Sequence, residues 1–252
     1  MRRILVIGIG PGDPEQLTLQ AIAALNRVDV FFVLDKGEVK ADLLELRKQI
    51  CARFVQRPNY RIVEVPDPVR DERIASYSER VAHWHEERAR LIAQQLTSEL
   101  GPDECAGFLV WGDPALYDST LRVLERVRRD VELECEVIPG ISSVQLLAAR
   151  HRIALHPVAA PVYITTGRRL AEQRALPADG DLVVMLDGEC AWKTLETHEN
   201  LEIFWGAYLG TERELLVSGP LRERSREIEA LRAKARAEHG WIMDTYLIRR
   251  SR

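Results

Sequence analysis

Short apolar runs alternate with longer amphipathic segments through the first half of the chain. Nearly continuous apolar runs of this length are typical of strands buried on both faces of a parallel sheet. The predicted strands are Ile4–Ile7, Val28–Leu34, Arg61–Val65, Phe108–Trp111 and Cys135–Ile138, and the predicted helices between them are Glu15–Asn26, Asp42–Phe54, Ser78–Leu100 and Thr120–Arg128. This alternation predicts a parallel sheet with helices on both faces.

The pattern changes after Pro157, where strand-like segments follow one another at shorter intervals. The predicted strands are Val162–Thr165, Asp181–Leu186, Glu202–Tyr208, Arg213–Val217 and Trp241–Ile248, with a charged helix at Glu223–Glu238. Short connections allow antiparallel pairing, so we expect a mixed sheet here. The predicted fold class is therefore α/β, with a parallel-sheet N-terminal domain at residues 1–157 and a mixed-sheet α+β C-terminal domain at residues 158–252.

The composition is that of an ordinary globular protein, with 46% hydrophobic and 29% charged residues. The net charge of −4 does not favour a nucleic-acid partner, which usually meets a basic surface. The four cysteines are scattered without a C-x-x-C pair, so we expect no metal centre. The sequence shows no signal peptide and no apolar run long enough to span a membrane, so we expect a cytoplasmic protein.

The first candidate ligand-binding loop is Gly8–Pro14, which directly follows the first predicted strand. Its glycines Gly8, Gly10 and Gly12 permit positive φ angles and a close approach of a ligand to the main chain. A dinucleotide-binding loop has its third glycine one position later, where this chain has Asp13, and an acid there would repel a phosphate. The loop predicts a ligand that is not a polyanion. The alternative is an ordinary turn in which Asp13 caps the following helix.

Two further loops follow predicted strands of the same sheet. Trp111–Tyr117 contains Gly112-Asp113-Pro114, and Ile138–Ser143 contains Pro139-Gly140. Because ligands bind at the carboxyl edge of parallel strands, we expect the three loops to converge on one crevice. Taken alone, the second loop could be a helix start with proline at its first position, and the third a turn with a serine cap.

Together the three loops resemble the signatures of the tetrapyrrole (corrin/porphyrin) methylases. That family has G-x-G-P-G-D, G-D-P-x-x-[FY] and P-G-[IV]-[ST]-[SA] motifs, and all three occur here in that order. Leu17-Thr18, Gly210-Thr211 and Val217-x-Gly219-x-Leu221 also fit, so the resemblance covers nearly the whole chain. It implies two domains that hold S-adenosylmethionine between them, a small-molecule tetrapyrrole substrate and a homodimer.

The resemblance also implies a set of cofactor-binding residues. The set is Pro11, Trp111, Gly112, Asp113, Leu116, Ser142, Ser143, Leu186 and Gly210. The family often has methionine at the position of Leu186, so Met185 is an alternative there. The family's Thr-Gly-His reads Thr166-Gly167-Arg168 here, which leaves the role of Arg168 open.

Within the family, the chain resembles the deacetylating C1 methylases more than their relatives. The resemblance lies in Val33–Gly37, His83–Arg88 and Met185–Glu189. It implies that the substrate is precorrin-5, which gains a ring methyl group and loses acetate. Attack of water on an acetyl group needs a general base. Asp35, at the end of the second predicted strand, is the first candidate, and His85 and Glu86 are the next.

The sequence leaves ordinary alternatives open for these residues. Asp35 could be a solvated loop acid, and His83 could pair with Glu87 on an exposed helical face. Arg168 and Arg169 could bind substrate carboxylates or simply lie on the surface. For the whole chain, the alternatives are a family member acting on another ring carbon or on protein or RNA, a nicotinamide-dependent dehydrogenase with Asp35 as the ribose-binding acid, and a non-catalytic nucleotide sensor.

Overall fold

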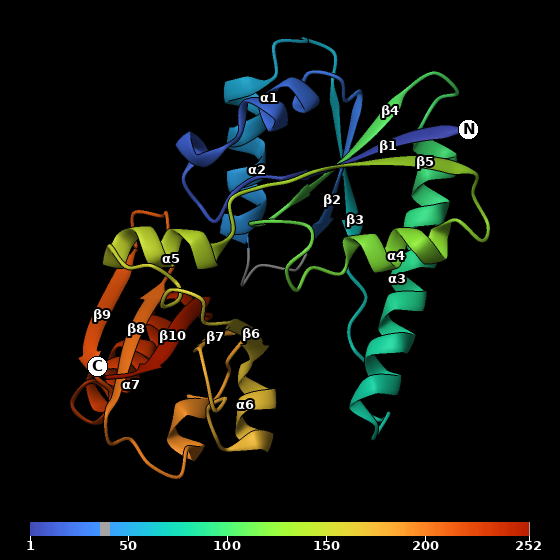
Figure 1. Cartoon of the computed structure of the whole chain (residues 1–252). Helices are drawn as coiled ribbons and strands as arrows, with labels where there is room; N and C mark the ends of the chain where they lie inside the picture. The colour runs from blue at the N-terminus through green and yellow to red at the C-terminus, as the bar shows by residue number, and fades with distance from the viewer. Residues whose placement is uncertain (36–40, 252) are drawn as a thin grey trace. The chain divides into compact units, whose positions relative to one another are not determined.

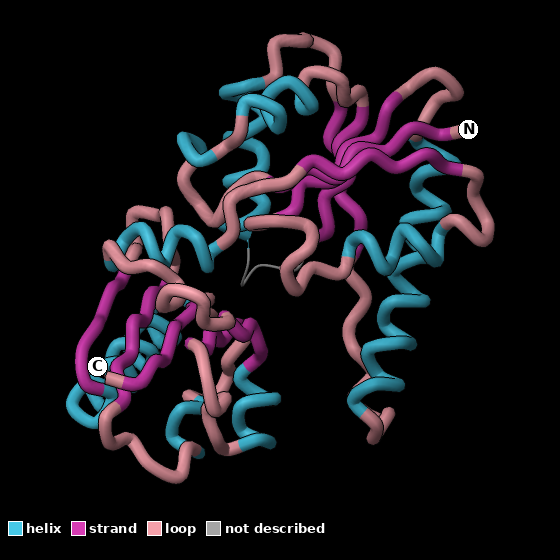
Figure 2. Tube along the Cα trace, viewed as in Figure 1, coloured by secondary structure: helices cyan, strands magenta, loops and turns pink. Residues whose placement is uncertain are grey.

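The structure, a computed structural model, describes residues 1–35 and 41–251. Contacts within the chain divide it into two units, Met1–Ser142 and Ser143–Arg252. Each unit is built around a five-stranded sheet with helices packed on it (Figure 1, Figure 2). The two units are described one after the other.

The sheet of the first unit is parallel, as the alternation of strands and helices predicts. Its strands lie in the order β3-β2-β4-β1-β5. They are β1 (Arg2–Gly8), β2 (Val30–Asp35), β3 (Arg61–Pro66), β4 (Cys105–Val110) and β5 (Leu133–Ile138). Because β4, β1 and β5 are neighbours that run the same way, the loops that follow them begin side by side at one edge of the sheet.

Helices cover both faces of this sheet. In the described residues they are α1 (Leu19–Leu25), α2 (Ala41–Phe54), α3 (Tyr77–Glu99) and α4 (Thr120–Val127). Successive residues of a strand point to opposite faces. Accordingly, Leu5 and Ile7 of β1 lie in a buried core with residues of α1 and α2, whereas Ile4 and Val6 lie in a second core with residues of α3 and α4.

The first helix is shorter than the hydrophobic pattern predicts. A 3-10 helix, η1 (Pro14–Gln16), and α1 stand where the sequence predicts a single helix over Glu15–Asn26. Thr18 separates them, because its backbone is extended and its hydroxyl accepts a hydrogen bond from Ala21 N (3.0 Å), which caps α1. A capping threonine inside an apolar pattern is the signal for this break.

The second unit contains the predicted mixed sheet. Its strands lie in the order β6-β7-β10-β8-β9, with β6 and β7 parallel and the other neighbours antiparallel. The strands are β6 (Val162–Thr166), β7 (Asp181–Met185), β8 (Leu201–Ala207), β9 (Leu215–Pro220) and β10 (Asp244–Arg250), and the helices are α5 (Ser143–His151), α6 (Gly167–Gln173), η3 (Ala191–Thr194) and α7 (Leu221–His239). The sequence pattern does not reveal α5 and α6, since nine and seven residues are too few to establish a helical period.

The boundary between the units lies earlier than the predicted one between residues 157 and 158. α5 belongs to the second unit, because its buried residues Val144, Leu146 and Leu147 pack with Val183 and Leu247 of the second sheet. The proline-containing segment that suggested a boundary is therefore a connection within the second unit. Local composition marks such a turn, whereas the true boundary depends on which sheet α5 packs against.

Residues 1–35 and 41–251 contain neither a membrane-spanning helix nor a group of side chains arranged to bind a metal ion. No helix there is long and apolar enough to cross a bilayer. No group of three or more His, Cys, Asp or Glu side chains in those residues is arranged to hold a metal ion. All four cysteines lie in the described ranges, and all four are free thiols.

Leu147 tests the assignment of α5 to the second unit, because its side chain is fully buried against that sheet. We expect Leu147→Ala to lower the free energy of unfolding by about 2–5 kcal/mol, since it leaves a cavity. Urea denaturation followed by circular dichroism measures this change. Leu19→Ala is the control: that side chain is 86% exposed, and its loss should change stability by less than about 0.5 kcal/mol. Equally small effects of both variants would contradict the packing of α5.

Candidate functional site

The glycine-containing loops meet at the carboxyl edge of the parallel sheet. Gly10 and Gly112 form an antiparallel bridge, with hydrogen bonds from Gly112 N to Gly10 O (2.8 Å) and from Gly10 N to Gly112 O (3.3 Å). Their φ angles are 77° and 68°, which glycine adopts without strain. The predicted convergence of the first two loops is therefore confirmed.

The third loop packs against the other two through Gly140. A Cβ atom on Gly140 would lie 2.8 Å from the Gly8 carbonyl carbon and closer still to the Gly112 oxygen. A Cβ atom on Gly8 would lie 2.6 Å from Gly140 N. Glycine is thus required on both sides of this contact, because no side chain fits between the main chains. We call the assembly of residues 8–13, 111–117 and 139–142 the three-loop junction.

Asp113 ties the three-loop junction together with its carboxylate. Its Oδ2 atom accepts a hydrogen bond from Gly140 N (2.9 Å), and its Oδ1 atom accepts one from Ala115 N (2.8 Å). The chain after Asp113 forms turns, and α4 begins only at Thr120. The alternative in which Asp113-Pro114 starts a helix is therefore wrong, and the aspartate instead links the second loop to the third.

Asp13 has the capping role that the sequence left open as an alternative. Its carboxylate accepts a hydrogen bond from Glu15 N (2.8 Å) and caps η1. The hydrogen bonds made by Asp13 and Asp113 come from main-chain N–H groups of uncharged peptide units. The junction therefore carries acidic side chains, which suit a cationic ligand better than a phosphate.

The other residues predicted for this edge differ in exposure. Pro11 is buried, and Ser142 is also buried, with 2% of its surface exposed. Trp111 and Leu116, which flank Gly112 and Asp113, are half-buried. Part of each of these two side chains can therefore reach a ligand.

Leu186 and Gly210 lie at one edge of the second sheet. β7 and β8 both pair antiparallel with β10, so they run parallel to each other and end at the same edge. Leu186 directly follows β7, has a left-handed φ of 54° and is 61% exposed. Gly210 has a φ of 79° and donates from its N–H to Glu214 Oε2 (2.7 Å). Ser143 reaches this edge too, through a hydrogen bond between its Oγ and Thr245 Oγ1 (2.9 Å).

A buried polar network holds Leu186 in its strained conformation. The Asp187 carboxylate accepts a hydrogen bond from the Tyr246 hydroxyl (2.7 Å), and the Asp187 carbonyl accepts one from Arg232 Nη2 (2.6 Å). Arg232 also forms a buried ion pair with Asp244. Burial raises the pKa of Asp244 to about 6, against the opposite effect of Arg232. With Asp187 anchored at both its side chain and main chain, the turn at Leu186 points an apolar side chain into solvent.

A second buried polar cluster lies on α3, beside the end of β3. Arg88, whose side chain is 4% exposed, donates two hydrogen bonds to one oxygen of Asp67 and one to the other, and also donates to Ser119 Oγ (2.8 Å). Its guanidinium lies 3.7 Å from the ring centroid of Trp84. Since Asp67 follows β3 directly, this cluster stands at the same edge of the sheet as the three-loop junction.

His85 is buried within reach of this cluster. Only 7% of its surface is exposed, and its ring nitrogens have no hydrogen-bond partner within residues 1–35 and 41–251. Burial lowers the pKa of His85, and the positive charges of nearby arginines lower it further; these are Arg126, Arg88, Arg122 and Arg70. The imidazole is therefore held neutral, in the form that accepts a proton.

The other predicted catalytic and charged residues fall into different environments. Glu86 is exposed and pairs with Arg126 (3.4 Å) and Arg129 (3.5 Å), so its carboxylate is already engaged. Glu87 pairs with Arg90 (3.3 Å). Asp35 ends β2 at the carboxyl edge, but its side chain lies outside the described part of the structure.

The arginines predicted to meet substrate carboxylates belong to α6. Arg169 is exposed and pairs with Glu172 (3.1 Å) on the same helix. Arg168 is exposed as well.

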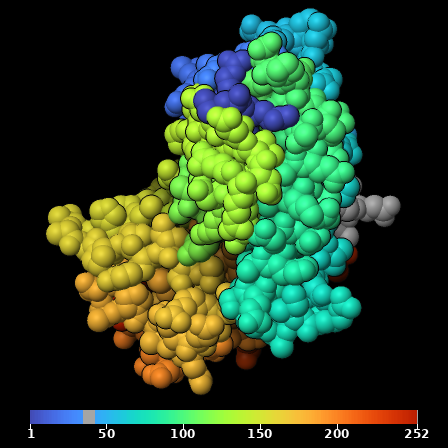
Figure 3. Space-filling model, turned by 90° about the vertical axis from the view of Figure 1, so that its right-hand side faces the viewer, coloured from blue at the N-terminus to red at the C-terminus, as the bar shows by residue number. Residues whose placement is uncertain are grey.

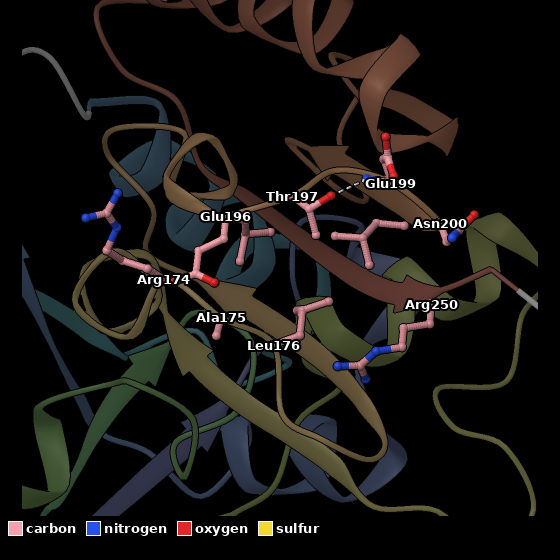
Figure 4. Close-up of a pocket in the computed structure, with 10 residues that line it drawn as sticks. Arg174, Ala175, Leu176, Glu196, Thr197, Glu199, Asn200 and Arg250 are labelled. Atoms are coloured by element: carbon pink, nitrogen blue, oxygen red, sulfur yellow. Dashed lines mark hydrogen bonds between the residues drawn. The ribbon is translucent and has the colours of Figure 1, made fainter.

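A pocket of about 330 Å³ lies elsewhere, in the second unit (Figure 4). Its lining includes Arg174, Leu176 and Leu195, and also Leu201 at the start of β8 and Arg250 at the end of β10. These strand ends lie at the edge of the sheet opposite to Leu186 and Gly210. The pocket therefore takes no part in the candidate site.

The burial of His85 was not predicted above, although the spacing of apolar residues along α3 indicates it. His85, Ala89, Ile92 and Leu96 are spaced as one face of a helix, and all four are buried. Continuing the apolar stripe of α3 towards its N-terminus places a histidine on the buried face. A polar residue at such a position is informative, because buried polar groups need either a partner or a function.

Comparison with known proteins gives a consistent result. The family model described as Tetrapyrrole (Corrin/Porphyrin) Methylases matches residues 3–224. The chain is 51% identical to the precorrin-6A synthase (deacetylating) of Sinorhizobium sp over 253 residues, which cover 99% of this chain and 96% of that protein. It is 27% identical to the uroporphyrinogen-III C-methyltransferase of Cyanidium caldarium over 82% of this chain and 65% of that protein.

Solved structures with a similar fold also include proteins of cobalamin synthesis. A cobalamin-synthesis-related protein (CobF) of Corynebacterium diphtheriae is 42% identical and has a TM-score of 0.83, with 100% of both chains covered. A cobalt precorrin-4 methyltransferase, CbiF, is 16% identical and has a TM-score of 0.62, with 98% of this chain and 94% of that chain covered. At that identity the second structure supports the fold alone, and the predicted fold class is confirmed.

Gly140→Ala tests the three-loop junction. We expect it to lower stability by about 1–3 kcal/mol or more, because the added Cβ overlaps main-chain atoms of both other loops. Differential scanning calorimetry should show a lower Tm. Gly188→Ala is the matched control, since no atom lies within 4 Å of a Cβ placed there, and its Tm should stay close to that of the wild type. A Tm of Gly140→Ala equal to that of the control would contradict the close packing of the loops.

Proposed function

The chain belongs to the tetrapyrrole (corrin/porphyrin) methylase family, and we propose that it is an S-adenosylmethionine-dependent C-methyltransferase that converts precorrin-5 to precorrin-6A with release of acetate. The observation that carries this proposal is the similarity to precorrin-6A synthase (deacetylating) over nearly the whole length of both chains. A nicotinamide-dependent dehydrogenase is disfavoured by the family and by the acidic first loop. The sequence relatives that act on other ring carbons are less similar to this chain.

The residues of the three-loop junction fit S-adenosylmethionine. This cofactor is a cation that supplies a methyl group from its sulfonium centre. Asp13 and Asp113 give the junction negative rather than positive side chains, and the glycines Gly10 and Gly112 allow a ligand to approach the main chain. We assign the methionine part of the cofactor to Gly112 and Asp113, with Trp111, Leu116, Pro11 and Ser142 alongside.

The adenine side of the cofactor is assigned to the second unit. Leu186 offers an exposed apolar side chain, held by the anchored Asp187, and Gly210 and Ser143 lie at the same sheet edge. An exposed apolar group in a strained conformation is a reasonable contact for a flat aromatic ring, since its burial by a ligand is favourable. Met185, the alternative to Leu186, belongs instead to the periphery of a core cluster.

The reaction needs a base that deprotonates water. Water then adds to the acetyl carbonyl carbon, the bond from that carbon to the ring breaks, and acetate leaves. The electron pair of the broken bond stays on the ring carbon, which forms the new bond to the methyl group. The bond from the methyl group to the sulfonium sulfur breaks at the same time, and S-adenosylhomocysteine is the leaving group. A base contributes on the order of 10²–10⁴-fold to such a step. The protein also gains rate by holding the reacting groups in line.

His85 is the described side chain that best suits the role of this base. It is neutral, nine-tenths buried and without a hydrogen-bond partner among residues 1–35 and 41–251, so its nitrogen is available to accept a proton. Asp35 stays the alternative, because it ends β2 at the carboxyl edge. Glu86 is the weakest candidate, since two arginines already pair with its carboxylate.

The cellular setting is part of the same proposal. By resemblance to the family, we propose a cytoplasmic homodimer that acts on a small-molecule substrate. The acidic net charge gives no support for a nucleic-acid partner, and none is proposed.

The proposed reaction is tested with precorrin-5 and S-adenosylmethionine labelled in its methyl group. We expect one labelled methyl group on the macrocycle and one free acetate for each turnover, measured by mass spectrometry and an enzymatic acetate assay. Label without acetate would point to methylation of another ring carbon. Neither product, with tight binding of S-adenosylhomocysteine, would point to the non-catalytic sensor.

The base is tested by the pH dependence of acetate release. Because the pKa of His85 is lowered, kcat/KM of the wild type should stay on its plateau to below pH 6.5, the ordinary value for histidine, and fall only as His85 becomes protonated. His85→Asn should lower acetate release by about 10²-fold or more while the affinity for S-adenosylhomocysteine changes by less than about twofold. Undiminished release by His85→Asn together with a loss in Asp35→Asn would reassign the base to Asp35.

Stability should follow the same titration with a defined sign. Below about pH 6.5 the unfolded chain takes up a proton on His85 while the folded protein resists it, so the wild type loses stability as the pH falls. We expect this loss between about pH 7 and pH 5 to be smaller in His85→Asn. Urea denaturation across that range measures the difference, and parallel curves for the two proteins would contradict the lowered pKa.

A further inference from the structure

Two guanidinium groups lie against the indole ring of Trp84. The guanidinium carbon of Arg88 lies 3.7 Å from the centroid of the indole ring, and that of Arg70 lies 4.5 Å from it. The indole N–H donates to the carbonyl of Pro68 (2.7 Å), which fixes the ring against the segment that follows β3. The negative electrostatic face of an aromatic ring attracts a cation placed over it.

The two arginines differ in what neutralises them. Arg88 is buried and is balanced by Asp67. Arg70 is exposed, and within residues 1–35 and 41–251 it forms neither a hydrogen bond nor an ion pair. Its contact with Trp84 is made with an aromatic ring and not with an acid. The ring therefore holds the cation near α3, and none of the five N–H donors of Arg70 is used in a hydrogen bond to another described residue.

More positive charge gathers around the same point from α4. Arg122 donates to the main-chain carbonyl of Asp118 (3.4 Å), and Arg126 shares Glu86 with Arg129. Arg70, Arg88, Arg122 and Arg126 all act electrostatically on His85. Among the described residues, two of these four arginines form ion pairs with acids: Arg88 with Asp67, and Arg126 with Glu86. Arg70 and Arg122 are thus left as an excess of positive charge, in a chain whose net charge is −4.

The position of this charge agrees with a ligand-binding role. Arg70 belongs to the segment directly after β3, and Arg122 belongs to the first turn of α4, which follows the loop after β4. Both therefore stand at the carboxyl edge of the parallel sheet, as the three-loop junction does. α3, in blue-green, lies at the surface of the face shown in Figure 3.

We propose that Arg70, held over the ring of Trp84, and Arg122 bind peripheral carboxylates of the tetrapyrrole substrate and so place the macrocycle beside His85. This inference rests on the proposed function for the identity of the substrate. Guanidinium binds a carboxylate through two parallel hydrogen bonds, and a guanidinium already held against an aromatic ring loses less freedom when it does so. The role is one of positioning, since neither arginine takes part in bond making.

Arg70→Met tests the proposal, with Arg73→Met as the matched control. Arg73 lies three residues further along the same segment, is exposed and already pairs with Asp71 (2.8 Å), so its loss changes the net charge equally. We expect KM for precorrin-5 to rise about tenfold in Arg70→Met, with kcat within about twofold of the wild type and the affinity for S-adenosylhomocysteine unchanged. Arg73→Met should match the wild type in all three. Arg70→Lys keeps the charge but not the paired N–H donors of the guanidinium, and its KM for precorrin-5 should lie between that of the wild type and that of Arg70→Met.

A binding measurement separates this proposal from the proposed function. Uroporphyrin III, a stable porphyrin polycarboxylate, can be titrated against each variant by fluorescence quenching without any turnover. Binding about tenfold weaker in Arg70→Met than in Arg73→Met supports the carboxylate site even if the wild type releases no acetate from precorrin-5. Equal affinities in the two variants would overturn it: if both were weakened, general electrostatic attraction would explain the binding, and if both were unchanged, Arg70 would take no part in it.

Discussion

The candidate site depends on the contact of three main chains at Gly8, Gly112 and Gly140. Here the ends of three neighbouring strands approach so closely that a single Cβ atom would overlap a carbonyl group. The Asp113 carboxylate then joins the second loop to the third, and the Gly10–Gly112 bridge joins the first to the second. Gly8 and Gly140 of the sequence motifs are therefore required by the packing of the loops themselves.

Each unit contains a buried ion pair. In the first unit, Arg88 and Asp67 fix α3 to the end of β3 and hold Trp84 in place. In the second, Arg232 and Asp244 support the turn that carries Leu186. Buried ion pairs contribute little net stability, but removing one partner is strongly destabilising, by about 3–5 kcal/mol. Their value here lies in fixing the direction of exposed neighbours, namely Arg70 in one unit and Leu186 in the other.

Both sheets and the convergence of the glycine-containing loops could be predicted from the sequence. Strand periodicity predicted both sheets, and glycine spacing after parallel strands predicted the convergence around Gly10 and Gly112. The division of the chain after Ser142 depends instead on the long-range packing of Leu147, which local composition does not carry. The conformation of Leu186 depends on Tyr246, which is 59 residues away from Asp187 in the chain, and no local pattern carries such a contact.

A crystal structure of the protein with S-adenosylhomocysteine tests most directly whether the three-loop junction holds the cofactor. The expected density places the amino-acid end of the ligand at Gly112 and Asp113, and the adenine ring against Leu186 and Gly210. Density for the ligand at any other place, with residues 111–117 making no contact to it, would contradict the assignment of the site.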